Sequence, residues 1–125
     1  MRNEKLYGRV LNWDDIEGED ARPGVSRKGY ASDEVMLVRN VIELGLEVRP
    51  HKHDDFDQLV MILEGKCNFF LEDTPHPMGP GDLMLVPRTV MHHIDVTEGP
   101  CVNLDVFVPP REDYGHLVAY ADDLK

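Results

Sequence analysis

From residue 35 to residue 108, short apolar runs alternate with clusters of turn-forming residues. The runs are rich in β-branched and other apolar side chains, and glycine, proline or charged residues bound them, which is typical of strands. The predicted strands cover residues 35–44, 46–53, 58–63, 67–71, 82–86, 92–96 and 102–108, with a further short one near residues 25–30. Seven or eight short strands separated by regular turn signals predict an all-β sandwich or barrel.

Turn-forming residues predict how these strands connect. A tight turn at residues 64–66 is expected to join the two runs beside it into a hairpin. Residues 74–81 contain three prolines, so they are expected to form a loop and neither a helix nor a central strand. A turn at residues 98–100 separates the last two predicted strands, and the final fifteen residues are expected to hold at most two helical turns.

The length of 125 residues fits one domain: residues 35–110 form the predicted barrel, residues 1–34 an N-terminal arm of the same fold, and residues 111–125 a C-terminal tail. A formal net charge of −11 argues against nucleic acid and anionic membranes as partners, because both need a basic surface. No apolar run is long enough to span a bilayer, and the first residues lead into no secretory signal. We therefore expect a cytoplasmic protein in which Cys67 and Cys101 are small apolar side chains, with a disulfide between them as the alternative.

Two spaced motifs contain most of the histidines. The first is Gly45-x5-His51-x-His53-x4-Gln58-x6-Gly65. Because side chains alternate between the faces of a strand, His51 and His53 are expected to point to the same face. After a four-residue corner, Gln58 opens a strand that runs back, which could bring a third donor alongside the two imidazoles.

The second motif is Gly81-x5-Pro87-x-Thr89-x2-His92-x3-Val96. Gly81 lies at a turn, Pro87 ends a strand, and His92 begins the next one. His92 and His93 are adjacent, so they face opposite sides of that strand. We interpret His93 as a supporting or surface residue.

The two motifs resemble the paired motifs of the cupin superfamily, G-x5-H-x-H-x3,4-E-x6-G and G-x5-P-x-G-x2-H-x3-N, across residues 45–96. The resemblance implies a single-domain cupin jelly-roll barrel, also called a double-stranded β-helix, with a metal ion in its mouth. Carried over by position, the implied metal ligands are His51, His53, Gln58 and His92. Gln58 replaces the usual glutamate, whereas Thr89 and Val96 replace a glycine and an asparagine whose roles concern turn and packing.

A narrower resemblance, to the KdgF-type cupins of pectin degradation, covers Asp57-Gln58, residues 105–114 and the N-terminal stretch of residues 24–28. Those cupins act on 4,5-unsaturated monouronates from pectin or alginate breakdown, give the linear 5-keto-4-deoxyuronate, and hold their metal with three histidines and a glutamine. The resemblance implies catalytic roles for Asp105 and Arg111. It also implies that Phe107 and Arg111 bind the substrate.

The implied ligand set has a chemical consequence. Three neutral imidazoles and a neutral amide leave the charge of a divalent cation uncompensated, which makes the ion a stronger Lewis acid. The set also lacks the carboxylate of the ligand triad that iron(II) oxygenases use. We therefore expect one divalent transition metal (zinc, nickel, manganese, cobalt or iron) and non-redox chemistry on a small oxygen-rich substrate, with unsaturated uronates, which are sugar acids, as the first candidates.

Other interpretations stay open at this point. The histidines could line a polar barrel mouth without a metal, and Phe107 could be an ordinary core residue. Asp105 could be a structural carboxylate, and Arg111 could pair on the surface with Glu112 or Asp113. Another metallocupin activity (an isomerase, a polyketide cyclase or a dioxygenase) or a non-catalytic sugar-binding cupin fits the same motifs. Short exposed β edges are usually paired, so a homodimer is also expected.

Overall fold

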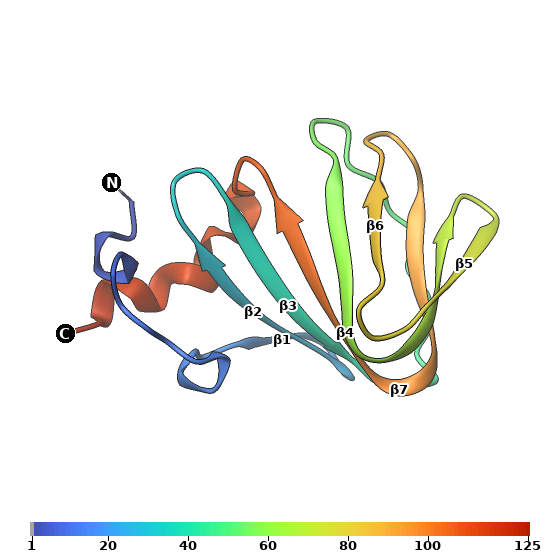
Figure 1. The fold of residues 1–125 in the computed structure, drawn as a ribbon, viewed down its shortest axis with the longest axis horizontal. Coiled ribbons are helices and arrows are strands. Elements are labelled where there is room, and N and C mark those ends of the chain that lie inside the picture. The colour runs from blue at the N-terminus through green and yellow to red at the C-terminus, as the bar shows by residue number, and fades with distance from the viewer. Residues whose placement is uncertain (1) are drawn as a thin grey trace.

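The computed structural model describes residues 2–125, which form one curved antiparallel sheet and three 3-10 helices (Figure 1). The strands in this part of the chain are β1 (Glu19–Arg22), β2 (Val25–Ala31), β3 (Met36–Ile42), β4 (Gln58–Leu71), β5 (Thr74–Met78), β6 (Leu83–Val86) and β7 (His92–Phe107). The helices are η1 (Glu4–Leu6), η2 (Trp13–Asp15) and η3 (Glu112–Asp123). The all-β architecture that the hydrophobic pattern predicted is confirmed.

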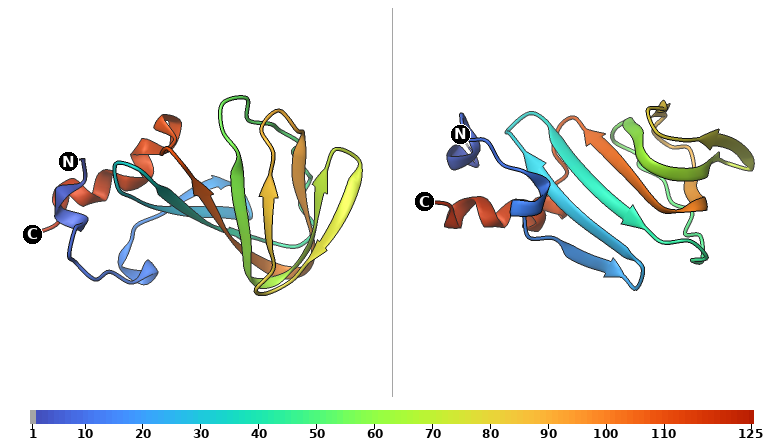
Figure 2. Two further views of the ribbon diagram at one scale, coloured as in Figure 1. Left: turned by 45° about the horizontal axis from the view of Figure 1, so that its top comes forward. Right: turned by 60° about the horizontal axis from the view of Figure 1, so that its bottom comes forward.

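The long strands β4 and β7 give the sheet its barrel-like shape. The strand order is β1-β2-β3-β7-β4-β5, and β6 also pairs with β4. In Figure 1, β4 and β7 run down one wall, bend together at the bottom and rise along the other wall. Figure 2 shows η3 and the N-terminal segment gathered at the end of the sheet that holds β1, β2 and β3, away from β5. The concave inner face therefore opens toward the top of Figure 1.

The hairpin predicted over residues 58–71 is wrong, because β4 continues through it as one strand and pairs with β7 on both sides of the bend. Register irregularities between Ile62 and Cys67 bend the strand and do not reverse it. Gly65 lies at the bend with a φ of 75°, and a Cβ there would lie 2.7 Å from the carbonyl oxygen of Glu98. A glycine is needed because the two strands bend against each other here. For the same reason β7 is one strand where the sequence predicted two.

Three further expectations are corrected. Residues 74–78 form β5 and not a loop; β5 pairs only with β4, and an edge strand tolerates prolines. Residues 46–53 form no strand, and only His51 makes a bridge, to His92. The C-terminal helix η3 is 12 residues long, more than the two turns expected, because three of its side chains are buried in the core.

Two clusters of buried side chains stabilise the barrel. One packs under η3 and includes Met36, Val38, Phe107 and Leu117. The other includes Val60, Ile62, Phe69 and Val86, together with the buried free cysteines, Cys67 and Cys101. Three polar side chains are as buried as these apolar ones: Gln58, His92 and Asn103. No helix within residues 2–125 combines the length and the apolar character that crossing a membrane requires.

Candidate metal centre

Three histidines from two distant parts of the chain meet at the mouth of the barrel. His51 and His53 lie in the loop before β4, and His92 is the first residue of β7. Two backbone hydrogen bonds of 3.0 and 2.7 Å join His51 to His92 and hold the loop against the strand. The ring centres of His51 and His92 lie 4.3 Å apart, and those of His53 and His92 lie 5.1 Å apart. Ligating atoms of the three side chains all lie within 4.8 Å of one another, so together they could hold a metal ion.

Backbone carbonyls fix the tautomer of two of these imidazoles. The Nδ1 atoms of His51 and His92 lie 3.0 and 3.1 Å from the carbonyl oxygens of Arg49 and Val90. An Nδ1–H that donates to a carbonyl leaves Nε2 unprotonated and able to bind a metal. The Nε2 atom of His92 is buried and has no hydrogen-bond partner, which is unfavourable unless a ligand satisfies it. The three histidines therefore fit the ion that the sequence motifs implied.

The surroundings of His53 and His92 favour their neutral form, which is the state that binds a metal. Burial lowers the pKa of His53 to about 4, and the nearby charge of Arg111 lowers it as well. Burial also lowers the pKa of His92 from its usual value. The ring of His53 stacks on Phe56 with 4.8 Å between the ring centres, and His92 stacks on Phe69 at 5.8 Å. These aromatic side chains shield the imidazoles from water and fix their orientation.

The side chain of Gln58 connects the histidines to a carboxylate. Its amide nitrogen donates to Oδ1 of Asp105 at 2.7 Å, and its amide oxygen lies 3.1 Å from Nε2 of His53. An amide whose nitrogen is bonded to a carboxylate presents its oxygen on the opposite side. The oxygen is the amide atom that binds metal ions. Asp105 therefore orients Gln58 with its oxygen toward His53, one of the three clustered imidazoles.

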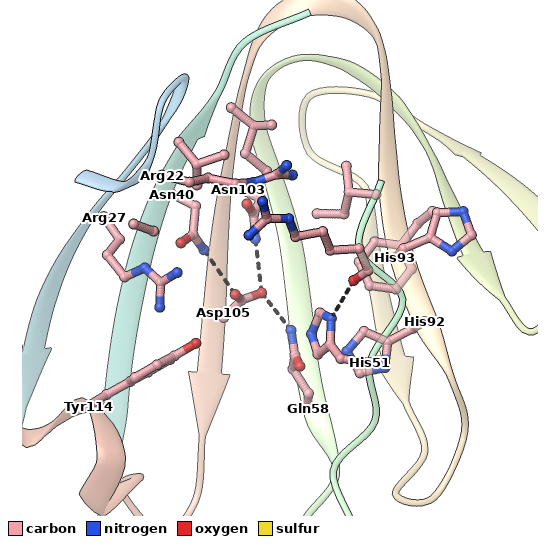
Figure 3. A pocket seen from close by; sticks show the side chains of 16 residues that line it. Arg22, Arg27, Asn40, His51, Gln58, His92, His93, Asn103, Asp105 and Tyr114 are labelled. Atoms are coloured by element: carbon pink, nitrogen blue, oxygen red, sulfur yellow. Dashed lines mark hydrogen bonds between the residues drawn. The ribbon is translucent and has the colours of Figure 1, made fainter. Parts of the chain in front are cut away.

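Asp105 is held by a set of amide donors (Figure 3). Asn103 donates to the same oxygen as Gln58 at 2.9 Å, and Asn40 donates to the other oxygen at 2.9 Å. Burial raises the pKa of Asp105 to about 6, while the hydrogen bonds from Gln58 and Asn40 and the charge of Arg111 act in the opposite direction. A carboxylate has about four acceptor positions, so one of them stays available beside these three donors.

A pocket of about 300 Å³ opens beside these groups. This volume lies at the lower end of the range of about 300–1,000 Å³ for small-molecule sites. The side chains that could act chemically on a ligand in it are His51, Gln58, His92, His93 and Asp105, and three arginines and Tyr114 also line it. In Figure 3 the labelled histidines lie on one side of Asp105, and Arg27 and Tyr114 lie on the other.

Arg111 and Phe107 lie next to the metal centre but do not line this pocket. Nε and Nη2 of Arg111 donate to the two carboxylate oxygens of Asp113 at 3.0 and 2.6 Å. Its guanidinium also lies 3.8 Å from the centre of the Tyr114 ring. Phe107 is buried, with its ring centre 6.1 Å from that of His53. The structure thus brings five of the seven predicted site residues into direct reach of one another and places these two beside them.

Sequence reasoning missed Asn40, Asn103, Arg27 and Tyr114. Strand alternation offers a signal for Asn103. In β7 it shares one face with Asp105 and with the buried Phe107. The same argument applies to Asn40 in β3, since a polar side chain on an apolar inner face is costly unless it is bonded. Arg27 and Tyr114 come from opposite ends of the chain, and no local pattern predicts that they meet.

Comparison with known proteins adds to this picture. The family model described as "AraC-like ligand binding domain" matches residues 43–108. The pectin degradation protein KdgF of Dickeya dadantii (strain 3937) is 29% identical over 102 residues, which are 81% of this chain and 93% of that protein. Protein SchB of Streptomyces halstedii is 26% identical over 118 residues, which are 87% of this chain and 85% of that protein.

Solved structures of similar fold include KdgF from Halomonas sp., with a TM-score of 0.77 and 29% identity over 85% of this chain and 97% of that one. An RmlC-like cupin from Shewanella frigidimarina NCIMB 400 has a TM-score of 0.76 and 26% identity over 85% of this chain and 95% of that one. Both matches cover almost the whole of the compared structures and 85% of this chain.

Proposed function

This chain belongs to the AraC-like ligand binding domain family and has the cupin fold that its motifs predicted, and we propose that it is a metal-dependent, non-redox enzyme. The reaction we propose is the linearisation of 4,5-unsaturated monouronates to 5-keto-4-deoxyuronates, which the likeness to KdgF supports. The observation that carries the proposal is the position of Gln58 between Asp105 and the three histidines. It connects a neutral ligand set to a carboxylate through one hydrogen-bonded amide.

We assign the metal to His51, His53, His92 and Gln58. All four donors are uncharged, so a divalent ion held by them would keep its full charge and polarise an oxygen atom of the substrate. Imidazole and amide donors accept zinc, nickel, manganese, cobalt and iron(II). Because no carboxylate belongs to the set, it favours polar chemistry over activation of oxygen.

The proposed reaction is an isomerisation. The hydroxyl at C1 loses its proton and becomes a carbonyl, the bond between C1 and the ring oxygen breaks, and the ring oxygen keeps the electron pair as part of an enolate. A proton then adds to C4, and the former ring oxygen becomes the 5-keto group. The atoms balance without an oxidant, a reductant or water, so the protein has to supply one group that takes a proton and returns it.

Asp105 is the residue that we propose for this proton transfer. Three amide donors fix the position of its carboxylate, and one acceptor position stays available for the substrate. A carboxylate within hydrogen-bond reach of a reacting hydroxyl can act as a general base and then as a general acid. The same hydrogen bonds connect β3, β4 and β7, so a purely structural role is the alternative to be tested.

Phe107 and Arg111 remain proposed members of the site, as the wall on the side of His53. The Phe107 ring centre lies 5.4 Å from that of Phe56, and the Arg111 guanidinium lies 5.0 Å from the Phe107 ring. We propose that Phe107 shapes this wall and that Arg111 adds positive charge to it. Both features favour an anionic substrate with an apolar edge at the double bond.

The test is an assay of the purified protein loaded with each candidate metal in turn and of the protein after chelation. The substrates are unsaturated galacturonate and mannuronate monomers, and the signal is the absorbance of the 4,5-double bond. We expect the absorbance to fall, NMR to show the linear 5-keto product, and chelation to abolish turnover reversibly. If no metal-loaded form changes either sugar, the proposed reaction is wrong. The metal centre is tested separately by elemental analysis of the wild type and of His92→Ala, which we expect to lose the ion.

The same experiment separates the other activities that fit the motifs. Oxygen consumption with iron(II) would indicate a dioxygenase. A sugar acid that binds but stays unchanged by NMR would indicate a non-catalytic binding protein.

A further inference from the structure

The pocket beside the metal centre differs in charge from the chain as a whole. The chain carries a formal net charge of −11, yet the pocket is lined by Arg22, Arg27 and Arg49 and by a single carboxylate, that of Asp105. A partly enclosed pocket with walls of low dielectric strengthens the field of such a local group of charges. The pocket therefore favours an anionic ligand, although the molecule as a whole is strongly acidic.

Arg27 extends the row of polar side chains that surrounds Asp105. In the sheet register, Arg27 of β2 lies opposite Asn40 of β3, and Asn40 lies opposite Asn103 of β7. Directly opposite residues have Cβ atoms about 4.5–5.5 Å apart, and both asparagines donate to Asp105. Figure 3 shows the Arg27 guanidinium directed into the space between Asp105 and Tyr114.

The protein leaves one donor of the Arg27 guanidinium without a hydrogen bond. Its Nε atom is buried and has no hydrogen-bond partner. The carboxylate of Glu19 lies 3.8 Å from this Nε, beyond hydrogen-bond distance. The other oxygen of Glu19 lies 3.0 Å from Nε2 of His116 in η3, and this contact holds the Glu19 carboxylate toward η3. A ligand carboxylate in the pocket would bind the Arg27 guanidinium in the paired geometry that guanidinium groups prefer. A small shift of the side chain would bring the buried Nε into this pair and supply its missing acceptor.

We infer that Arg27 binds the carboxylate of the substrate and so makes the pocket specific for sugar acids. The identity of the sugar acid rests on the proposed function, whereas the carboxylate site rests on the unpaired Nε and on the arginine-lined pocket. In Figure 3, Asp105 lies between Arg27 and the labelled histidines. A sugar acid held by Arg27 therefore extends past the proposed proton-transfer group toward the metal donors.

This assignment gives Arg111 a second task besides the positive charge that it adds to the wall near His53. Asp113 already occupies two of its donors, and its guanidinium packs on the ring of Tyr114. The same ring lies 5.0 Å from the Arg27 guanidinium. Arg111 thus acts as a positioning residue: it holds Tyr114, which in turn bounds the space in which Arg27 meets the carboxylate.

The experiment compares Arg27→Gln with Arg39→Gln, a matched control because Arg39 lies in the neighbouring strand β3 on the opposite face from Asn40. Calorimetry measures the binding of galacturonate and of its uncharged methyl ester to the metal-loaded proteins. We expect Arg27→Gln to weaken galacturonate binding by roughly 10- to 100-fold, as loss of a charged hydrogen bond does, and to leave binding of the ester nearly unchanged. Arg39→Gln should change neither.

Two further variants keep the inference testable if Arg27→Gln does not fold. Arg27→Lys keeps the charge but cannot make two parallel bonds, so its galacturonate affinity should be intermediate. Glu19→Gln removes the competing carboxylate without touching the pocket, so galacturonate should bind a few-fold more tightly. A wild-type protein that binds the ester as well as galacturonate, or an Arg27→Gln variant with unchanged galacturonate affinity, would overturn the inference.

These outcomes are separable from those of the proposed function. If unsaturated uronates are not converted but galacturonate binding still depends on Arg27, the reaction is wrong and the carboxylate site stands. If the uronates are converted and Arg27→Gln changes neither KM nor galacturonate binding, the reaction stands and the carboxylate site is wrong.

Discussion

Replacing Gln58 with glutamate should destabilise the metal-free protein, and the loss should grow with pH. The amide nitrogen of Gln58 donates to Asp105 at 2.7 Å, and Gln58→Glu replaces this donor with a second acceptor. Two ionised carboxylates at this distance repel each other by about 6 kcal/mol if the effective dielectric constant is about 20. The folded variant avoids most of this repulsion by holding one proton between the two carboxylates.

The free-energy cost of holding that proton follows from the pKa of Asp105 in the wild type. Burial raises the pKa of Asp105 to about 6, so protonating it costs about 1.4 kcal/mol for each pH unit above that value. The protonated carboxyl can then donate to the new glutamate, as the amide did to Asp105. The free energy of unfolding should therefore fall by about 1.4 kcal/mol at pH 7 and about 2.7 kcal/mol at pH 8. The sign follows from proton binding: between pH 6 and pH 8 the folded variant holds a proton that the unfolded chain has released, so its stability falls as the pH rises.

Urea unfolding at pH 6, 7 and 8 in the presence of a chelator measures this effect. The double variant Gln58→Glu/Asp105→Asn is the matched control, because it restores an amide donor and should show no such pH dependence. If the variant loses the same free energy of unfolding at pH 6 and at pH 8, the proposed hydrogen bond between Gln58 and Asp105 is refuted.

In the metal-loaded protein, Gln58→Glu should bind the ion more tightly and turn over more slowly. Undiminished activity at equal metal occupancy would contradict the role that we give to a neutral ligand.

Three other predictions follow from single features. Asp105→Asn should lower turnover by about 10²–10⁴-fold with the metal retained if Asp105 moves the proton; near-normal turnover would leave it a structural role. Leu83 and Leu85 are 61% and 70% exposed on β6, which pairs only with β4, so we expect two copies to associate there and Leu85→Lys to give monomers in analytical ultracentrifugation. The Tyr120 hydroxyl donates to a backbone carbonyl of β2 at 2.8 Å, so Tyr120→Phe should cost about 1 kcal/mol at pH 7. Burial raises the pKa of Tyr120 to about 12, so the wild type should lose stability above pH 10 more steeply than this variant, as alkaline unfolding curves would show.

The meeting of the three histidines could be predicted because the motif spacing carries the geometry. His51 and His53 are two residues apart, and the structure brings both imidazoles close to His92 although they lie in a loop. The course of β4 and β7 could not be predicted in the same way. A glycine between polar residues, as at Gly65, is a signal both for a hairpin turn and for a bend within a strand. Only the pairing of the whole of β4 with β7 decides between them, and that pairing is not a local property of the sequence.

The departure of Gln58 from the cupin motif and the presence of Asp105 are explained together by the sheet register. In that register Gln58 lies opposite Phe107, and Asp105 lies two residues from Phe107 on the same face. Diagonal neighbours are within reach of a long side chain, and Gln58 makes this contact through its amide nitrogen. A glutamate in its place would oppose one carboxylate with another, so a carboxylate at Asp105 favours a neutral residue at the metal. In the proposed site, the negative charge that other cupins place among the metal ligands thus lies one hydrogen bond away, on the carboxylate that we propose for the proton transfer.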